Sequence, residues 1–275
     1  MARSKGAPTP EGIGESESAL SPAPRLQFST LDGRAVPAVT VAEMREIDRV
    51  AVEETGPTLL QMMEHAGLEL ALAALAMLGE RWSASRVVVL AGSGGNGGGG
   101  LSAARHLATR GVGVLAVLSG PVAAMNGAVA DQLRTLAEAP ARVIPWSDAF
   151  DVGEADLVVD AVIGYGLSGA PAGPEMALIR ASQAAAAPVL SLDIPSGLDA
   201  DSGEASGVAV RPERTLTLAL PKQGLRRENA GELWLADLGI PPGVYARAGL
   251  AFASPFGPRS QIPLHYPGED GSEPA

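Results

Sequence analysis

Apolar residues along this chain alternate between short continuous runs and helical spacings of three and four residues. Continuous runs rich in β-branched residues predict buried strands, and the wider spacing predicts helices. The predicted strands are residues 86–90, 113–118, 142–144, 156–162, 188–192, 214–219 and 232–236. Helices are predicted from Thr40 onward and at residues 59–77, 101–110, 122–138 and 174–186. This alternation predicts an α/β fold with a mostly parallel sheet that is covered on both faces.

Local signals mark where the first two helices begin and end. Thr40 and Glu43 have the spacing of a capping box, which predicts a helix start at that point. Gly56-Pro57 ends this first helix. Gly67 lies inside the second helix, where it predicts either close packing or a kink.

A glycine-rich segment, residues 92–100, separates the strand at 86–90 from the helix that is predicted to start at Leu101. A helix that follows such a loop presents free backbone N–H groups and the positive end of its dipole, both of which favour phosphate. Asn96 supplies the loop's one side chain with real hydrogen-bonding reach. We therefore predict a loop that contacts a ligand, against the alternative of an uncommitted turn.

Two segments match the dinucleotide fingerprint literally, Gly92-x-Gly94-x-x-Gly97 and Gly164-x-Gly166-x-x-Gly169. An NAD-dependent dehydrogenase also needs an acid at the end of its second strand. The second predicted strand ends in Leu118-Ser119-Gly120-Pro121, without an acid, which disfavours that class. A phosphate-binding P-loop is disfavoured too, because no Gly-Lys-Ser/Thr follows the glycines.

Two carboxylates, Asp160 and Asp193, stand at the ends of apolar strands. A carboxylate in such a place is costly unless it is paired, ligated or used, although each could also cap a neighbouring loop. Ser196 lacks the context of a nucleophile and is interpreted either as a turn residue or as a hydroxyl ligand. An oxygen-ligated cation held by Asn96, Asp160 and Ser196 fits these residue types.

These polar residues belong to three loops, at residues 92–100, 160–169 and 193–199, each at the carboxyl end of a predicted strand. Ligands of open parallel sheets bind beyond those ends. If the strands are neighbours, the three loops meet in one crevice.

Other titratable residues give weaker signals. His65, His106 and His265 are scattered, which makes a zinc site improbable. Lys222 follows a strand, where a solvated lysine is the ordinary interpretation.

Composition restricts the class of protein. The 275 residues are 46% hydrophobic, enough for one large core, and the formal net charge of −11 argues against nucleic-acid or anionic-membrane partners. The chain has no cysteine, which excludes disulfides and thiolate chemistry. No secretory signal and no unbroken apolar run of about 18 residues is apparent, so a cytoplasmic protein is predicted.

Composition also suggests the domain boundaries. Residues 1–38 and 254–275 are rich in Pro and Gly, which predicts flexible extensions around one domain at 39–253. Residues 26–28 are the part of the first extension that is expected to dock.

Together these motifs resemble the YjeF N-terminal domain family, the NAD(P)H-hydrate epimerases. The resemblance extends from Thr40 to about Tyr245. It rests on six segments in order: residues 62–67, 92–107, 160–166, 193–203, 221–225 and 237–241. The most specific is Asp193-Ile194-Pro195-Ser196-Gly197-Leu198-Asp199-Ala200-Asp201-x-Gly203.

The resemblance implies a Rossmann-like three-layer α/β/α sandwich and the interconversion of the R and S forms of hydrated NADH and NADPH. It implies one K⁺ per subunit, held by Asn96, Asp160 and Ser196. The implied substrate contacts are Gly94, Gly95, Asn96, Gly97, Gly98, Gly99, Gly164, Tyr165, Gly166, Leu167, Ser168, Gly169, Ala170 and Asp193. We assign proton transfer to Asp193 as a hypothesis. A homodimer and a separate NAD(P)H-hydrate dehydratase are the expected protein partners.

The glycine loop departs from the family pattern Gly-x-Gly-Asn-Asn-Gly-Gly-Asp-Gly. Gly95 replaces the first Asn and Gly99 replaces the Asp, and His65 replaces an Asn in the earlier motif. Two alternatives therefore stay open: a non-catalytic nucleotide-binding module on the same fold, and an enzyme that acts on another small molecule.

Overall fold

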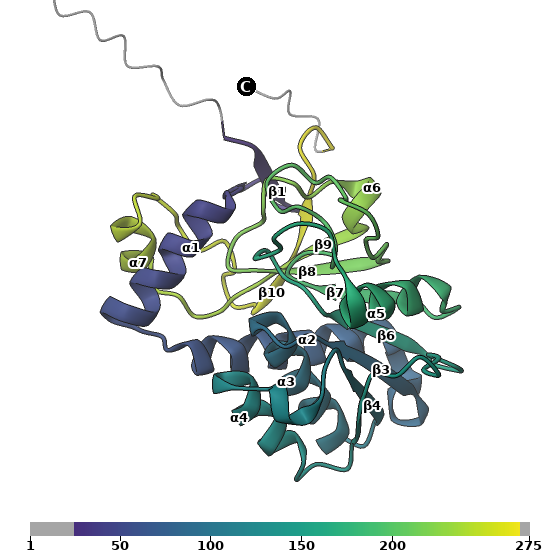
Figure 1. Ribbon diagram of the computed structural model, residues 1–275. Coiled ribbons are helices and arrows are strands. Elements are labelled where there is room, and N and C mark those ends of the chain that lie inside the picture. Colours follow the sequence, from purple (N-terminus) through teal and green to yellow (C-terminus); the bar gives the residue numbers. More distant parts are fainter. Residues whose placement is uncertain (1–24, 270–275) are drawn as a thin grey trace, which may run out of the picture.

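The computed structural model describes residues 25–269 (Figure 1). Ten strands form one sheet in the order β2-β1-β10-β9-β8-β7-β6-β3-β4-β5. The strands are β1 Gln27–Thr30, β2 Ala35–Pro37, β3 Arg86–Ala91, β4 Gly113–Leu118, β5 Arg142–Pro145, β6 Leu157–Ala161, β7 Val189–Leu192, β8 Arg214–Leu218, β9 Glu232–Ala236 and β10 Gln261–His265. From β5 to β9 neighbouring strands pair in parallel, and the pairs β9–β10, β10–β1 and β1–β2 are antiparallel.

The helices cover the sheet as the alternating pattern predicts. They are α1 Val41–Arg49, α2 Leu59–Leu78, α3 Gly95–Thr109, α4 Gly127–Leu136, α5 Gly173–Ala184, α6 Arg227–Ala230 and α7 Pro242–Arg247. A π-helical segment, Val50–Thr55, extends α1, and short 3₁₀ segments lie at Gly79–Ala84 and Val122–Ala124.

Strand β3 shows how the two faces are filled. Val87 and Val89 pack in the cluster that includes α2, α3 and α4, whereas Val88 and Leu90 pack in the cluster that includes α5. Successive side chains of a strand point to opposite faces, so a run of apolar residues buries both. The α/β/α sandwich implied by the resemblance is thus confirmed.

The predicted helix start at Thr40 and the predicted close packing at Gly67 are both confirmed. Thr40 and Glu43 form both hydrogen bonds of the capping box at the start of α1. At Gly67 the close packing is confirmed, because a Cβ built there would lie 2.3 Å from the Cβ of Ser102 on α3. Glycine lets the backbones of α2 and α3 approach at this contact.

Helix α3 begins at Gly95, six residues before the predicted start at Leu101. The predicted loop at 92–100 is therefore mostly helix, and the turn between β3 and α3 is limited to residues 92–94. Built Cβ atoms would lie 1.8 Å from the carbonyl oxygen of Gly92 at Gly97 and 2.5 Å from the Cβ of Ala161 at Gly100. Close packing therefore requires glycine at these positions of α3. The low helix propensity of glycine had instead predicted a loop.

The sheet extends beyond the predicted domain boundaries at both ends. Strands β1 and β2 fall within the stretch 1–38, and β10 falls within 254–275, both of which were predicted to be flexible. Phe28 is buried, as the expected docking of residues 26–28 requires. Ile262 and Leu264 are also buried, and their alternate spacing is a strand signal that overall Pro and Gly content obscured. Residues 1–24 and 270–275 lie outside the described residues.

One helical segment, Leu59–Ala84, is long and apolar enough by mean hydropathy to cross a membrane, although polar residues such as Glu64 and Glu69 interrupt its apolar run. Half of its most apolar window is buried inside the protein. Core helices of soluble proteins pass the same test, so this property is weak evidence for a membrane span.

Candidate functional site

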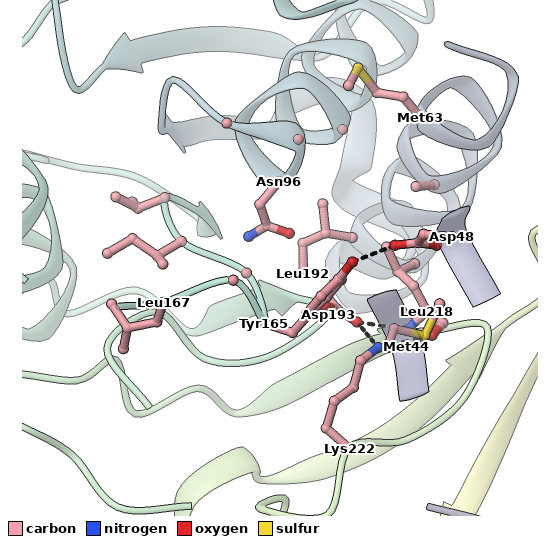
Figure 2. A pocket seen from close by; sticks show the side chains of 18 of the residues that line it. Met44, Asp48, Met63, Asn96, Tyr165, Leu167, Leu192, Asp193, Leu218 and Lys222 are labelled. Carbon is pink, nitrogen blue, oxygen red and sulfur yellow. Dashed lines mark hydrogen bonds and ion pairs between the residues drawn. The ribbon is translucent and has the colours of Figure 1, made fainter. Parts of the chain in front are cut away.

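A pocket of about 570 Å³ lies where the three predicted loops meet at the carboxyl ends of β3, β6 and β7 (Figure 2). The expectation that they share one crevice is therefore confirmed. The predicted substrate residues that line it are Gly94, Gly95, Asn96, Gly99, Gly164, Tyr165, Gly166, Leu167, Ser168, Ala170 and Asp193. Gly97, Gly98 and Gly169 are outside this lining set. The volume falls in the range of small-molecule sites.

The amino-terminal end of α3 forms one wall of the pocket. Its N-cap, Gly94, has no side chain with which to cap the helix. The Asn96 side chain packs against Gly164, and its Nδ2 is buried without a hydrogen-bond partner among residues 25–269. A buried amide donor without a partner costs free energy, so this atom favours a ligand in the pocket.

Asp193 lies immediately after β7, with a positive φ of 68°. Non-glycine residues rarely adopt this conformation, and it occurs often at functional sites. The Asp193 carboxylate accepts hydrogen bonds from Lys222 Nζ and from the backbone N–H of Leu218, the latter at 3.3 Å. Lys222 also donates to the Leu218 carbonyl at 3.0 Å.

Lys222 is 1% exposed, so the prediction of a solvated lysine is wrong. Its ammonium group compensates the charge of Asp193, which is 3% exposed. The one local signal for a functional lysine was the position of Lys222 shortly after a strand. The pairing itself depends on how β7 and β8 lie side by side.

Asp160 and Ser196 lie together with no exposed surface, and neither is among the residues that line the pocket. The Asp160 carboxylate accepts hydrogen bonds from Ser191 Oγ at 2.8 Å and from the Ser196 backbone N–H and Oγ at 2.9 and 2.5 Å. Burial raises the pKa of Asp160, and these hydrogen bonds oppose that shift. Asp160 thus joins β6 to the turn after β7. The third predicted cation ligand, Asn96, lines the pocket, and its side chain forms no hydrogen bond with Asp160 or Ser196.

Helix α1 contributes side chains that the sequence interpretation missed. Met44, Arg45 and Asp48 all line the pocket. The Asp48 carboxylate accepts a hydrogen bond from the Tyr165 hydroxyl (Figure 2). Burial raises the pKa of Asp48. Helical spacing could have indicated Asp48 from the sequence, because Asp48 is four residues after buried Met44 and therefore lies on the same side of the helix.

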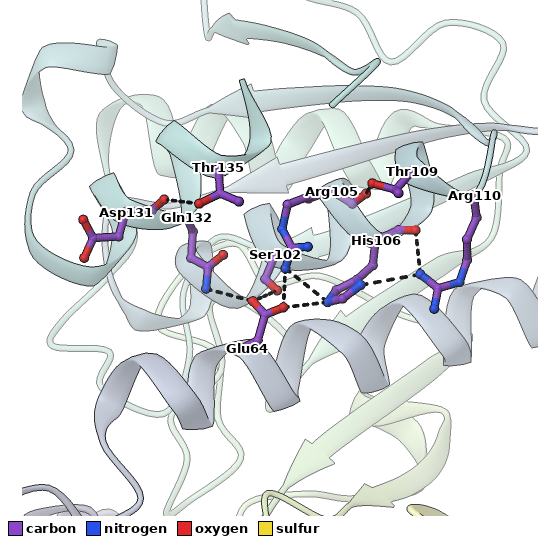
Figure 3. Close-up of polar contacts among 9 residues, drawn as sticks. All are labelled: Glu64, Ser102, Arg105, His106, Thr109, Arg110, Asp131, Gln132 and Thr135. Atoms are coloured by element: carbon purple, nitrogen blue, oxygen red, sulfur yellow. Dashed lines mark hydrogen bonds and ion pairs between the residues drawn. The ribbon is translucent and has the colours of Figure 1, made fainter. Parts of the chain in front are cut away.

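The histidines lie on three different elements, α2, α3 and β10, as their scatter predicted. His106 Nε2 is 2.9 Å from Glu64 Oε1, in a polar cluster that also includes Ser102 and Arg105 (Figure 3). Among residues 25–269, no three His, Asp or Glu side chains gather in a way that could hold a metal ion.

The fold and the pocket define an α/β/α sandwich with a pocket at the carboxyl edge of its parallel sheet. Residues 59–224 match the family described as YjeF-related protein N-terminus. The chain belongs to this family.

Named relatives agree with this assignment. The chain is 54% identical to the NAD(P)H-hydrate epimerase of Dehalogenimonas lykanthroporepellens, over 84% of this chain and 94% of that protein. It is 34% identical to the NAD(P)H-hydrate epimerase of Limosilactobacillus fermentum, over 73% of this chain and 96% of that protein. The bifunctional NAD(P)H-hydrate repair enzyme Nnr of Hyperthermus butylicus is 42% identical, over 74% of this chain and 39% of that protein.

A solved structure supports the fold. The crystal structure of yeast ynu0, YNL200c, superimposes with a TM-score of 0.70 over 82% of this chain and 99% of that chain. The sequence identity is 24%, so this likeness supports the architecture and carries no argument about function.

Proposed function

We propose that this protein interconverts the R and S forms of hydrated NADH and NADPH, as an isomerase of metabolite repair. The names of the relatives support this assignment. The structural observation that carries it is the buried Asp193–Lys222 pair, which lines a pocket next to the free end of a helix. The pair supplies proton-transfer groups, and the helix end supplies a place for the diphosphate.

The proposed chemistry requires only the movement of a proton and a water molecule. The hydrate carries a hydroxyl at C6 of the reduced nicotinamide ring. A proton passes from the Asp193–Lys222 pair to this hydroxyl, which leaves as water while the ring nitrogen stabilises the electron-poor carbon. Water then adds to the opposite face and returns the proton to the pair. The configuration is inverted, and nothing is oxidised or reduced.

One side chain of the pocket wall, Arg45, carries a positive charge that fits an anionic substrate. Arg45 lines the pocket, is exposed, and forms no hydrogen bond or ion pair with any residue from 25 to 269. Lys222 is the other cation among the lining residues, and Asp193 already neutralises it. Arg45 is thus the cation that remains for the phosphates of the substrate.

Potassium is the proposed resident ion. The donor set fits it, because Asp160, Ser196 and the Ile163 carbonyl offer oxygen atoms, with Ser196 Oγ 3.0 Å from that carbonyl. Asn96 is the proposed fourth contributor, through its amide oxygen. The ion would add positive charge near the diphosphate.

The substrate would pass between this protein and a NAD(P)H-hydrate dehydratase that consumes the S form. Relatives with the bifunctional name support such a partnership. A homodimer and a cytoplasmic location complete the proposal as predictions.

Epimerisation of purified S-hydrate tests the function directly. We expect the wild-type protein to convert S-hydrate to a mixture of both epimers, and Asp193→Asn to lose at least about 100-fold in kcat, the size typical of a lost acid–base group. Full activity in Asp193→Asn would eliminate this residue as the acid–base group. Saturable binding of the hydrate by a wild-type protein that does not epimerise it would instead support the binding-module alternative.

A further inference from the structure

Helix α1 lies outside residues 59–224, which match the family, yet it reaches the pocket. Asp48 projects from this helix toward Tyr165, on the pocket wall formed by the loop after β6 (Figure 2). The proposed chemistry has not used either side chain.

Tyr165 is held on two sides. Its hydroxyl donates to Asp48, and Lys222 Nζ lies 5.7 Å from the centre of its ring. Lys222 is in turn paired with Asp193. A continuous series of contacts therefore connects α1 to the proposed acid–base pair through the aromatic ring.

The backbone around Tyr165 gives the ring little support. Gly164 and Gly166 flank it, and glycine leaves the chain more conformational freedom than any other residue. A hydrogen bond to a charged acceptor is stronger than one between neutral groups, so Asp48 is suited to fix the ring. Burial and the nearby Asp48 charge raise the pKa of Tyr165 far above neutrality, and the hydroxyl therefore remains a donor.

Helix α1 does not need the Asp48 carboxylate to stay in place. The capping box holds its start, Met44 and Ile47 bury its apolar face, and the backbone N–H of Val41 donates to Asp201 at 2.7 Å. The one side-chain hydrogen bond of Asp48 within residues 25–269 is with Tyr165, which lines the pocket. Its carboxylate thus serves the pocket rather than the helix.

We propose that Asp48 is a positioning residue, which anchors Tyr165 against the Asp193–Lys222 pair and so fixes the wall beside the reacting ring. This inference rests on the proposed function. Among residues 25–269 the Asp48 carboxylate forms its hydrogen bond with Tyr165, and the two residues therefore form one unit.

A double-mutant cycle tests this unit. We expect Asp48→Ala and Tyr165→Phe each to lower kcat by about tenfold through lost alignment, with KM changed by less than about twofold. Because the two residues act together, we expect the double variant to lose about tenfold and not about 100-fold. Asp48→Asn keeps an acceptor oxygen and is expected to retain more activity than Asp48→Ala.

Asp131→Asn is the matched control, since Asp131 pairs with Arg134 on the surface of α4. We expect it to keep wild-type kcat. Multiplicative losses in the double variant, or wild-type kcat in Asp48→Ala, would overturn the proposal. A lowered melting temperature with unchanged kcat would likewise show that Asp48 has only a structural role.

A crystal structure of Asp48→Ala separates this inference from the proposed function. We expect the Tyr165 ring to leave its place beside Lys222. A ring that keeps its place would overturn the inference even if the wild-type protein is an active epimerase. Absence of epimerisation in the wild type would overturn the proposed function, while the position of the ring would still decide whether Asp48 anchors it.

Discussion

Two ionic clusters of this protein have similar chemistry but very different exposure. In the pocket cluster, Lys222 and Asp193 expose 1% and 5% of their side chains. In the helix cluster, the side chains of Arg105 and Glu64 are 20% and 40% exposed. Ser102 and Gln132 also donate hydrogen bonds to Glu64, as Figure 3 shows. The difference indicates that the two clusters serve different purposes.

A buried ion pair costs much of its attraction in lost hydration, so it adds little net stability. Its presence at the edge of the pocket, with Asp193 in a left-handed conformation, fits a chemical role. The half-exposed Glu64 cluster joins α2 to α3 and α4, and its charges lose little hydration because water still reaches them. It fits a role in packing.

The largest expected effect follows from breaking the buried pair. Lys222→Met leaves Asp193 without its counter-ion, and we expect a loss of about 3–5 kcal/mol in the free energy of unfolding. Urea denaturation at pH 7 measures it. We also expect kcat for the hydrate to fall, since Lys222 belongs to the proposed proton-transfer pair.

The double variant Asp193→Asn/Lys222→Met is the control for this prediction. It removes both charges, and we expect it to be more stable than Lys222→Met alone. Equal or lower stability of the double variant would contradict the view that an unpaired buried charge causes the loss.

The next largest effect on the free energy of unfolding is expected from substitution of a glycine in α3. Gly100→Ala places a methyl group 2.5 Å from the Cβ of Ala161, and we expect a loss of about 1–3 kcal/mol because helix and sheet must separate. Gly95→Ala is the matched control in the same helix, because no atom lies within 4 Å of its built Cβ. We expect Gly95→Ala to be as stable as the wild type or up to about 1 kcal/mol more stable. Thermal unfolding of both variants decides whether close packing explains the glycine run.

A smaller effect is expected in the helix cluster. Burial raises the pKa of Glu64, but hydrogen bonds from Arg105, Ser102 and Gln132 outweigh burial and lower it to about 2, from 4.5. With 40% of the side chain exposed, solvent screening limits the contribution to about 1 kcal/mol. We expect Glu64→Gln to lose about this much at pH 7 and to keep wild-type kcat.

The pH dependence gives an independent test of Glu64. Because the pKa of Glu64 is lower in the folded state, the unfolded state binds the proton more tightly. The contribution of ionised Glu64 to the free energy of unfolding is therefore complete above about pH 4.5. It should disappear as the pH falls from about 4.5 toward 2. Urea midpoints of the wild type and Glu64→Gln should therefore converge over this interval, and a constant difference would contradict the assignment.

The smallest expected effect concerns Arg45, the pocket cation that forms no ion pair with any residue from 25 to 269. Arg45→Gln is expected to raise KM for the hydrate about two- to fivefold with little change in kcat, since an exposed charge is screened by water. We expect this difference to shrink at about 1 M salt, where the Debye length is about 3 Å. An unchanged KM at low salt would remove Arg45 from the proposed phosphate contacts.

The sequence alone determined the features that depend on near neighbours. Strands β4 and β9 have the predicted bounds, Gly113–Leu118 and Glu232–Ala236, because apolar runs with clear ends report burial directly. The capping box at Thr40 needed only a residue three positions later. The order of the motifs along the chain, together with the strand-end loops, sufficed to suggest the family and the crevice.

Only the tertiary structure decided which distant residues meet. Lys222 and Asp193 are 29 residues apart, and Tyr165 and Asp48 are 117 apart. No local pattern encodes such pairs, because they depend on which strands become neighbours and on where α1 packs. The early start of α3 was hidden for the same reason. Glycine is a poor helix former by itself, and only contact with β6 and the turn at Gly92 explains why no larger side chain fits there.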